Sequence, residues 1–366
     1  MKNKLNKNSL FQKQLKNFKS IKRGYYSFLI LLFIYVLSFF NALLVNKNAL
    51  VVKYNDHFFF PAFRDLMAQF ITQPMYEAKY FKQDTLFGEP CFGEPNYREL
   101  KKRFRQAKTG NFVILPLYPY SPNEILLNEM SSNPPLAPSS KHILGIDNQG
   151  RDIFARLIYG FRISISFALI ITFFSYCIGI IAGAVLGFIG GKVDLLGLRI
   201  IEIISAIPFL FMTMILVSIV KPSFVLLASL LIILGGWIGI TYYIRGEFLK
   251  EKNKEYVLSA ISLGASNFRV MFKHILPNSL TPVITFAPFS IVGYISILVS
   301  LDFLGLGLMP PTPSWGELLN QGVADIKNWW LVLFPLLAIF LTLLLIIFIG
   351  ESIREAFDPK SYSRLK

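Results

Sequence analysis

The sequence predicts an all-α polytopic membrane protein with six transmembrane helices and a small external domain between the first and the second. Three observations lead to this prediction. Hydrophobic residues make up 54% of the 366 residues and charged residues only 16%, whereas a soluble domain has about 25% charged residues. The apolar residues gather into blocks of roughly 20, the length that crosses a bilayer. The formal net charge of +15 lies mainly in loops and tails, where basic residues set topology.

The chain begins with a basic segment that leads into a first apolar block. Residues 1–24 hold eight Lys or Arg and no Asp or Glu, and 25–45 is a long apolar run. A cleaved signal peptide is the alternative, but the run is longer than a typical signal-peptide core and no A-x-A-like site follows it. We therefore expect a cytoplasmic tail at 1–24 and an uncleaved first helix at 25–45.

Residues 46–150 form the longest polar stretch of the chain. Acidic and basic residues nearly balance there, and aromatic residues, prolines and the tandem FGEPCFGEP favour an ordered, turn-rich small domain. The basic run KKRFRQAK is more readily a solvated face than a nucleic-acid patch. The two cysteines are Cys91 in this stretch and Cys177 in an apolar block, so we expect no disulfide framework.

Five further spans are expected after this stretch, at about 163–189, 200–220, 224–244, 280–301 and 329–350. Gly179, Gly183 and Gly187 are four residues apart, so they line one helix face and permit close approach of a second helix. Pro208 predicts a kink in the third span. Only the sequence KPS separates the third span from the fourth, which predicts a tight hairpin.

The basic loops agree on one orientation. A basic N-terminus stays in the cytoplasm, and six spans return the C-terminal tail 354–366 to the same side. The segment 245–279 also falls inside, where its six Lys and Arg outnumber three Glu. The 46–150 insert then falls outside.

The cytoplasmic segment 249–279 contains the stretch SLGASNFRVMFKHILPN. Residues 249–263 have helix-forming composition and end at Gly264, a natural C-terminal stop, and Ser266 can cap a second helix. The apolar residues of that helix share one face at helical spacing: Phe268, Met271, Phe272 and Ile275. We expect helix, sharp turn, helix at the cytoplasmic surface. A single amphipathic helix lying on lipid is the alternative, but it has no need of the turn.

The stretch LSAISLGASNFRVMFKHILPN resembles the signature cytoplasmic loop of permeases of binding-protein-dependent ABC importers, E-A-A-x-x-x-G followed by I-x-L-P. The matching positions are Ala260, Gly264, Leu276 and Pro277. The departures are Leu258, Ser259 and His274, places where the peptide-importer branch often departs too.

Three other stretches resemble the peptide-importer branch. Residues 142–169 resemble LGTDxxGRDxxxRxxxGxRxS, 300–322 resemble the external loop before the last span, and GESIREAFDPK resembles the C-terminus. The coinciding positions of the first stretch are Gly145, Asp147, Gly150, Arg151, Asp152, Arg156, Gly160, Arg162 and Ser164. The chain is thus similar to the C-type permease of dipeptide, oligopeptide or nickel importers, and its large insert makes it most similar to the microcin C-type oligopeptide permeases.

The resemblance implies a transport subunit rather than an enzyme, with a permease core at 151–353 in a bacterial inner membrane. It implies a heterodimer with a second permease, two cytoplasmic ATPases and a periplasmic or lipid-anchored solute-binding protein, and no nucleic acid. ATP and Mg would be used by the ATPases, with no cofactor or metal bound by this chain. The sequence agrees, because it lacks a G-x-x-x-x-G-K-[ST] loop.

Two sets of residues are candidates for function. The ATPase-coupling loop would use Ala260, Gly264, Phe268, Arg269, Met271, Phe272, Lys273, Leu276 and Pro277. An external gate or docking element for the solute-binding protein would use Gly150, Arg151, Asp152, Arg156, Asp302 and Glu317. In this second set, Arg151, Asp152 and Arg156 are expected to pair across helical turns. The alternative for that segment is a surface helix that anchors the second span.

Other residue patterns are less informative. Glu202 is expected to pair with Arg199 at the membrane surface rather than to act within the membrane. The three histidines are scattered over both sides of the membrane, so they predict no metal or catalytic cluster.

Two other function classes remain as alternatives. An ion-coupled transporter or channel would show repeated halves and charges at mid-membrane, but the predicted spans are nearly free of charge there. A membrane-anchored enzyme acting through 46–150 would need a nucleophile–base arrangement, which the sequence does not show. The insert and the outer-loop pattern favour peptides over nickel as the substrate, and the choice among dipeptides, oligopeptides and modified peptides stays open.

Overall fold

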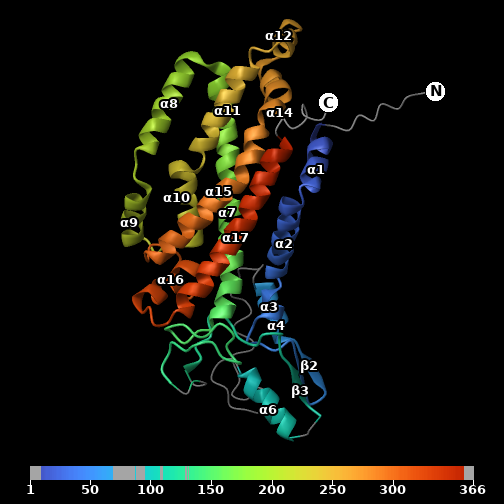
Figure 1. Ribbon diagram of the computed structural model, residues 1–366, viewed down its shortest axis with the longest axis vertical. Coiled ribbons are helices and arrows are strands. Elements are labelled where there is room, and N and C mark those ends of the chain that lie inside the picture. The colour runs from blue at the N-terminus through green and yellow to red at the C-terminus, as the bar shows by residue number, and fades with distance from the viewer. Residues whose placement is uncertain are drawn as a thin grey trace, which may run out of the picture. The chain divides into compact units, whose positions relative to one another are not determined.

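The computed structural model describes residues 10–68, 87, 95–107, 110–127, 130 and 132–357, and most of them are helical (Figure 1). Cys91, most of the FGEPCFGEP repeat and the tail beyond Phe357 lie outside these residues. Contacts divide the chain into two compact units. The larger unit comprises Met1–Leu32, Ser164–Met309 and Ile339–Lys366, and the insert unit comprises Phe33–Ile163 and Pro310–Ala338.

Four helical stretches in the described part of the chain are long and apolar enough to cross a membrane. They are α7 (Ile153–Ile189), the run Phe224–Glu251, α15 (Thr281–Phe303) and α17 (Trp330–Phe357). The number rises to six if each of two bent pairs is one span. These pairs are α1 (Leu10–Ser20) with α2 (Lys22–Ser38), and α8 (Gly191–Ser205) with α9 (Phe209–Ile219). The predicted fold class, an all-α membrane protein with six transmembrane helices, is confirmed, and the described helices provide four to six candidate spans.

The predicted span 200–220 is a broken helix. The first helix, α8, starts nine residues earlier than expected and ends at Ser205, and α9 follows at an angle of 62°. Pro208 lies at the break, where it has an extended backbone and precedes the first residue of α9. Proline lacks the N–H that a helix interior needs and disfavours helix in the residue before it, so the predicted kink is a full interruption.

The run Phe224–Glu251 contains a widened turn. It consists of α10 (Phe224–Leu231), the π-helical η3 (Ile232–Gly236) and α11 (Ile238–Glu251). The side chain of Ser223 caps the start by accepting the N–H of Leu226 at 3.2 Å. The hydroxyl of Tyr294 donates to the carbonyl oxygen of Gly236 at 3.0 Å, so a neighbouring helix satisfies a carbonyl in the π turn.

The glycine face of α7 packs against the backbone of α11. A Cβ atom placed on Gly179 would lie 2.1 Å from Cγ2 of Ile240, and one on Gly183 would lie 2.6 Å from the carbonyl oxygen of Thr241. Gly187 is similarly crowded. The close helix approach predicted from the four-residue spacing is therefore present, and side chains larger than hydrogen do not fit.

Replacing Gly183 with alanine is expected to destabilise the protein by about 1–3 kcal/mol, because the added methyl group overpacks a tight contact. The check is the apparent melting temperature of the detergent-purified protein. Gly246→Ala on α11 is the matched control, since a Cβ there meets nothing within 4 Å. Equal melting temperatures for the two variants would contradict the tight packing.

The insert unit contains a small antiparallel sheet in the order β2-β1-β3. Its strands are β1 (Val51–Tyr54), β2 (His57–Phe59) and β3 (Phe112–Ile114). Asn55 and Asp56 join β1 to β2 with φ of 48° and 63°, values that suit the two-residue turn of a tight hairpin.

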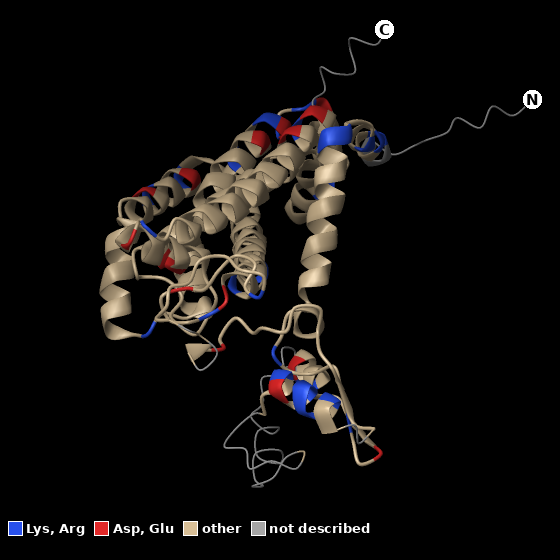
Figure 2. Ribbon diagram, turned by 60° about the horizontal axis from the view of Figure 1, so that its bottom comes forward, with Lys and Arg blue, Asp and Glu red and all other residues tan. Residues whose placement is uncertain are grey.

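The helix α6 (Tyr97–Ala107) covers one face of this sheet. Its buried residues pack with Val52 and Val113 of the sheet; they are Tyr97, Leu100 and Phe104. The Lys and Arg residues of the run KKRFRQAK that belong to α6 are exposed (Figure 2), as expected of a solvated face. The remaining helices described in this unit are α3 (Asn41–Leu44), α4 (Pro61–Ala68) and α16 (Trp315–Ala324).

Candidate functional site

The segment 249–279 forms a two-helix hairpin that continues from α11 in the larger unit (Figure 1). The predicted helix 249–263 is in fact two helices, because α11 ends at Glu251 and α12 spans Glu255–Ser262. Lys252 Nζ donates to the carbonyl oxygen of Phe188 at 2.5 Å, at the C-terminal end of α7. This tertiary contact, together with the weak helix propensity of Asn253, accounts for the break.

Gly264 makes the sharp turn that the sequence predicts. Its φ is +82°, its N–H donates to Ile261 O at 2.9 Å, and the N–H of Ala265 donates to Ala260 O at 3.1 Å. This pair of bonds is the Schellman arrangement that ends a helix. Ser266 then accepts the N–H of Arg269 through its hydroxyl at 3.4 Å, which caps the next helix as expected.

The second helix of the hairpin is not the regular α-helix that the apolar spacing predicts. A short α13 (Asn267–Arg269) leads into the π-helical η4 (Val270–Ile275) and then α14 (Leu276–Ser279). Pro277 cannot make the α-helical bond to Lys273, so the preceding turn widens. The side chain of Asn278 donates to His274 O at 3.0 Å and so satisfies one carbonyl there.

The single apolar face expected on this helix is therefore wrong. Val270 and Ile275 are fully buried, and Met271 packs against the same core. Phe268 and Phe272 instead remain 71% and 38% exposed, with ring centroids 4.5 Å apart. One side of the helix holds the hairpin to the protein, and the paired rings are free to contact a partner.

A buried carboxylate ties the base of the hairpin together, and the sequence analysis did not identify it. Glu251 accepts from Lys254 Nζ at 2.5 Å and from the hydroxyl of Tyr256 at 2.6 Å. The Tyr256 oxygen also accepts from Asn278 Nδ2 at 3.2 Å. Since these residues come from α11, α12 and α14, the hairpin is cross-linked at its base and its tip can move with α11.

Five of the six candidates for a gate or docking element lie in the insert unit, around the loop that precedes α7, and Asp302 lies in the larger unit. Asp147 organises this loop: Oδ1 accepts the N–H groups of Gln149 and Arg151 at 3.0 and 2.9 Å, and Oδ2 accepts Arg151 Nε at 2.7 Å. Gly150 has φ of +80° and its N–H donates to Asp147 O at 3.0 Å. Asp147 was noted in the sequence only as a matching position, yet it is the centre of the loop.

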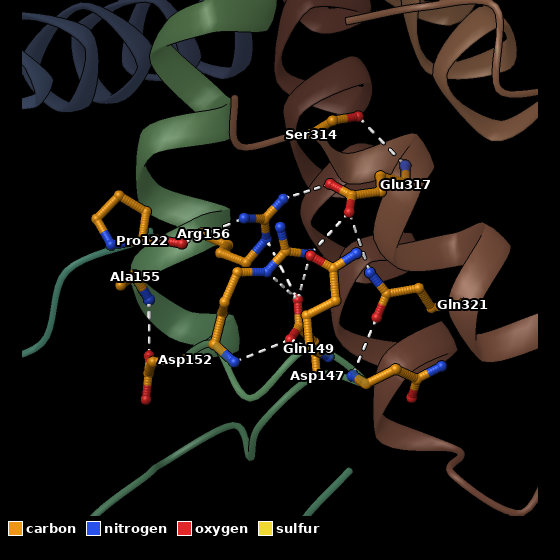
Figure 3. A network of polar contacts seen from close by, with 11 residues as sticks. Pro122, Asp147, Gln149, Asp152, Ala155, Arg156, Ser314, Glu317 and Gln321 are labelled. Atoms are coloured by element: carbon orange, nitrogen blue, oxygen red, sulfur yellow. Dashed lines mark hydrogen bonds and ion pairs between the residues drawn. The ribbon is translucent and has the colours of Figure 1, made fainter. Parts of the chain in front are cut away.

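Glu317 of α16 completes an ion cluster with two arginines (Figure 3). Arg151 Nη2 donates to Glu317 Oε1 at 2.7 Å, and Arg156 Nη2 donates to Glu317 Oε2. Arg156 also donates to the carbonyl oxygen of Pro122 at 3.2 Å. Ser314 caps α16 by accepting the N–H of Glu317 at 3.2 Å, which fixes where the carboxylate points. We call Asp147, Arg151, Arg156 and Glu317 the external ion cluster, after the side of the membrane that the sequence predicts for them.

The external ion cluster is buried, and its charges are mutually compensated. The side chain of Arg156 is fully buried and that of Glu317 is 15% exposed. Burial opposes the charge on Arg151, but hydrogen bonds and charge from Asp147 and Glu317 outweigh it and raise its pKa. A compensated cluster of this kind holds segments in place, which agrees with the alternative that the segment around Arg151 and Arg156 anchors the start of α7.

Asp152 and Asp302 do not take part in the external ion cluster. Asp152 caps α7, because Oδ1 accepts the N–H of Ala155 at 2.9 Å, while Oδ2 accepts the Tyr118 hydroxyl at 2.7 Å and contacts His142 Nδ1 at 2.9 Å. Burial and the Asp152 charge raise the pKa of Tyr118. The expected pairing of Arg151, Asp152 and Arg156 across turns is therefore wrong, because the Asp152 carboxylate binds other groups instead. Asp302 Oδ1, in the larger unit, accepts the N–H of Leu308 at 2.7 Å and closes a turn.

The ion pair predicted on α8 is present. Arg199 and Glu202 form the predicted pair at 2.6 Å, with both side chains more than half exposed. No group of three His, Cys, Asp or Glu among the described residues could hold a metal ion.

Comparison with known proteins identifies the family of the chain. The family described as "Binding-protein-dependent transport system inner membrane component" matches residues 175–361, which is half of the chain. The chain belongs to this family. The matched region contains α11 and the whole hairpin with Gly264.

Two curated relatives match nearly the whole length of this permease, and a third matches most of it. A peptidoglycan transport system permease protein YejE of Agrobacterium fabrum is 34% identical over 96% of this chain and 94% of its own. An inner membrane ABC transporter permease protein YejE of Escherichia coli is 36% identical over 93% of this chain and 95% of its own. An oligopeptide transport system permease protein OppC of Haemophilus influenzae is 34% identical over 80% of this chain and 99% of its own.

The predicted family is thus confirmed, and the chain is a membrane permease of the ABC importer type. Permeases of this family are transport subunits that operate with separate ATPase and substrate-binding partners. The two alternative classes, an ion-coupled transporter and a membrane-anchored enzyme, are not supported by these relatives.

Proposed function

We propose that this chain is the C-type permease of an ATP-driven importer for peptides or peptide-containing compounds, and that it forms half of the translocation path. The observation that carries the proposal is the set of relatives, whose names refer to oligopeptide, dipeptide and peptidoglycan transport. The partners would be a second permease chain, two cytoplasmic ATPases that use ATP and Mg, and a periplasmic or lipid-anchored solute-binding protein.

The proposed layout in the bacterial inner membrane follows the charge distribution. The tails 1–24 and 354–366 and the segment 249–279 lie in the cytoplasm, and the insert 46–150 lies outside. The excess of basic over acidic residues in the segments assigned to the cytoplasm supports this orientation.

The hairpin is the element through which ATP-driven movement would enter this chain. Phe268 and Phe272 would seat in an ATPase groove, with Arg269 and Lys273 at the polar rim. The cross-linked base at Glu251 favours movement of the hairpin with α11. The direct packing of α7 on α11 then favours movement of both helices as one body, which gives alternating access to the two sides of the membrane.

The external ion cluster would shape the surface that receives the solute-binding protein. Arg151 and Arg156 join the loop before α7 to α16 through Glu317. Because the charges are buried and compensated, their role would be to position these two segments, and the exposed residues around them would make the contact.

Replacing Phe268 with alanine is expected to weaken ATPase binding about thirtyfold, since truncating an exposed aromatic anchor typically costs ~2 kcal/mol. The measurement is the amount of ATPase that co-purifies with the permease at graded ATPase concentrations. Phe33→Ala on α2, where the side chain is 66% exposed, is the matched control. Unchanged ATPase binding by Phe268→Ala would contradict the proposed docking surface.

A further inference from the structure

The first described helix, α1, leaves the first predicted span at a right angle. Its stretch Lys13–Ser20 makes an angle of 91° with α2 across a break at Ile21. The ring of Phe18 holds the two helices together, with centroids 6.4 Å from Tyr25 and 6.3 Å from Phe28. If α2 crosses the bilayer, α1 therefore lies along the plane of the membrane.

The junction between α1 and α2 is held against α17. Arg23 contacts Glu351 and Glu355 at 3.6 Å each. A Cβ atom on Gly24 would lie 2.1 Å from the Ser352 hydroxyl, so α2 and α17 are in contact there. The exposed ion pairs contribute little by themselves, but the close packing of α2 on α17 holds the end of α2 from which α1 departs.

The two sides of α1 differ in chemistry. Lys13, Lys16 and Lys19 are three residues apart and exposed, so they share an arc of about 120° on the helix. Leu15 and Phe18 lie outside that arc, and Leu15 is 44% exposed. Among the residues that the structure describes, none of the three lysines forms a salt bridge, so their positive charges are uncompensated.

We propose that α1 docks on anionic phospholipids of the cytoplasmic leaflet. The exposed Leu15 would enter the boundary of the acyl chains, and the long stems of the lysines would carry their ammonium groups up to the headgroups. Anionic headgroups match the charge, since residues 1–24 hold eight basic residues and no acidic one. The right angle to α2 places the helix at the depth where headgroups lie. This inference rests on the proposed orientation of the chain, but not on which solute the permease carries.

Spin-label accessibility in the full chain tests this position. Single cysteines at Leu15 and Ser20, in a background of Cys91→Ser and Cys177→Ala, place labels on the apolar and polar sides of α1. In vesicles of phosphatidylcholine with phosphatidylglycerol, the label at 15 should collide more with oxygen than with an aqueous nickel complex, and the label at 20 should do the reverse. A label at Lys102 on α6 is the control that stays accessible to the nickel complex.

Two outcomes would overturn the inference. If the label at 15 is shielded from both reagents, α1 is packed against protein, and if the nickel complex reaches it freely, α1 is in water. Phosphatidylcholine alone should give a smaller docked fraction than the mixture, and high salt should reduce docking in the mixture.

Charge variants of α1 separate lipid binding from folding. Replacing Lys13, Lys16 and Lys19 with glutamine should lower the docked-to-undocked ratio about fivefold per residue at low salt. The matched variant with arginine at all three positions keeps the charge and should dock as the native chain does. Equal docking by the glutamine and arginine variants would show that charge does not hold α1 on the membrane.

Discussion

Replacing Gly264 with proline should abolish ATP-driven uptake while the protein still inserts in the membrane. Gly264 has φ of +82°, and proline holds φ near −65° and has no N–H. The variant therefore loses both the turn and the bond to Ile261 O. The tip of the hairpin would then be displaced, and the ATPases would lose their proposed docking surface. Uptake of a labelled oligopeptide by the complete complex, with the permease level measured in parallel, checks this result.

A graded series at the same position distinguishes backbone strain from damage to the fold. Gly264→Asn should retain most uptake, because asparagine visits the left-handed region readily, whereas Gly264→Val should reduce uptake about tenfold for a strain of ~1–2 kcal/mol. Since a Cβ at this position meets no atom within 4 Å, crowding does not explain the series. Full uptake by the proline variant would show that the turn has no part in coupling.

Local sequence signals predicted the parts of the hairpin that depend on neighbouring residues. Gly264 and Ser266 follow the general rules for helix ends, and the structure has both as expected. The π turn before Pro277 was missed, because regular helical spacing was assumed across it. Glu251 was missed because its role depends on Tyr256 and on Asn278, which lies 22 residues beyond Tyr256.

The external ion cluster shows a different limit of sequence reasoning. Arg156 and Glu317 are 161 residues apart, and no local pattern tells which distant acid an arginine meets. The resemblance selected both residues, but the pairing drawn from helical spacing gave Asp152 the wrong partners. The small sheet of the insert was likewise not predicted, since strands of three or four residues are too short to show an alternating pattern.

Replacing Glu317 with alanine should destabilise the insert unit by about 3–5 kcal/mol, the largest stability change expected here. The substitution leaves the fully buried Arg156 with only the Pro122 carbonyl and a 3.6 Å contact with Asp147. A buried charge that loses its partner costs far more than the pair contributed. The apparent melting temperature of the purified protein and its level in the membrane measure this loss.

Two comparisons decide whether the buried charge is the cause. Glu202→Ala removes an exposed carboxylate from a pair with Arg199 and should cost less than about 1 kcal/mol. The double variant Arg156→Met with Glu317→Leu removes both buried charges, so it should be more stable than Glu317→Ala alone. A double variant at least as unstable as the single one would mean that Glu317 acts through its packing or through Arg151, which would then be the partner that holds α16 to the loop before α7.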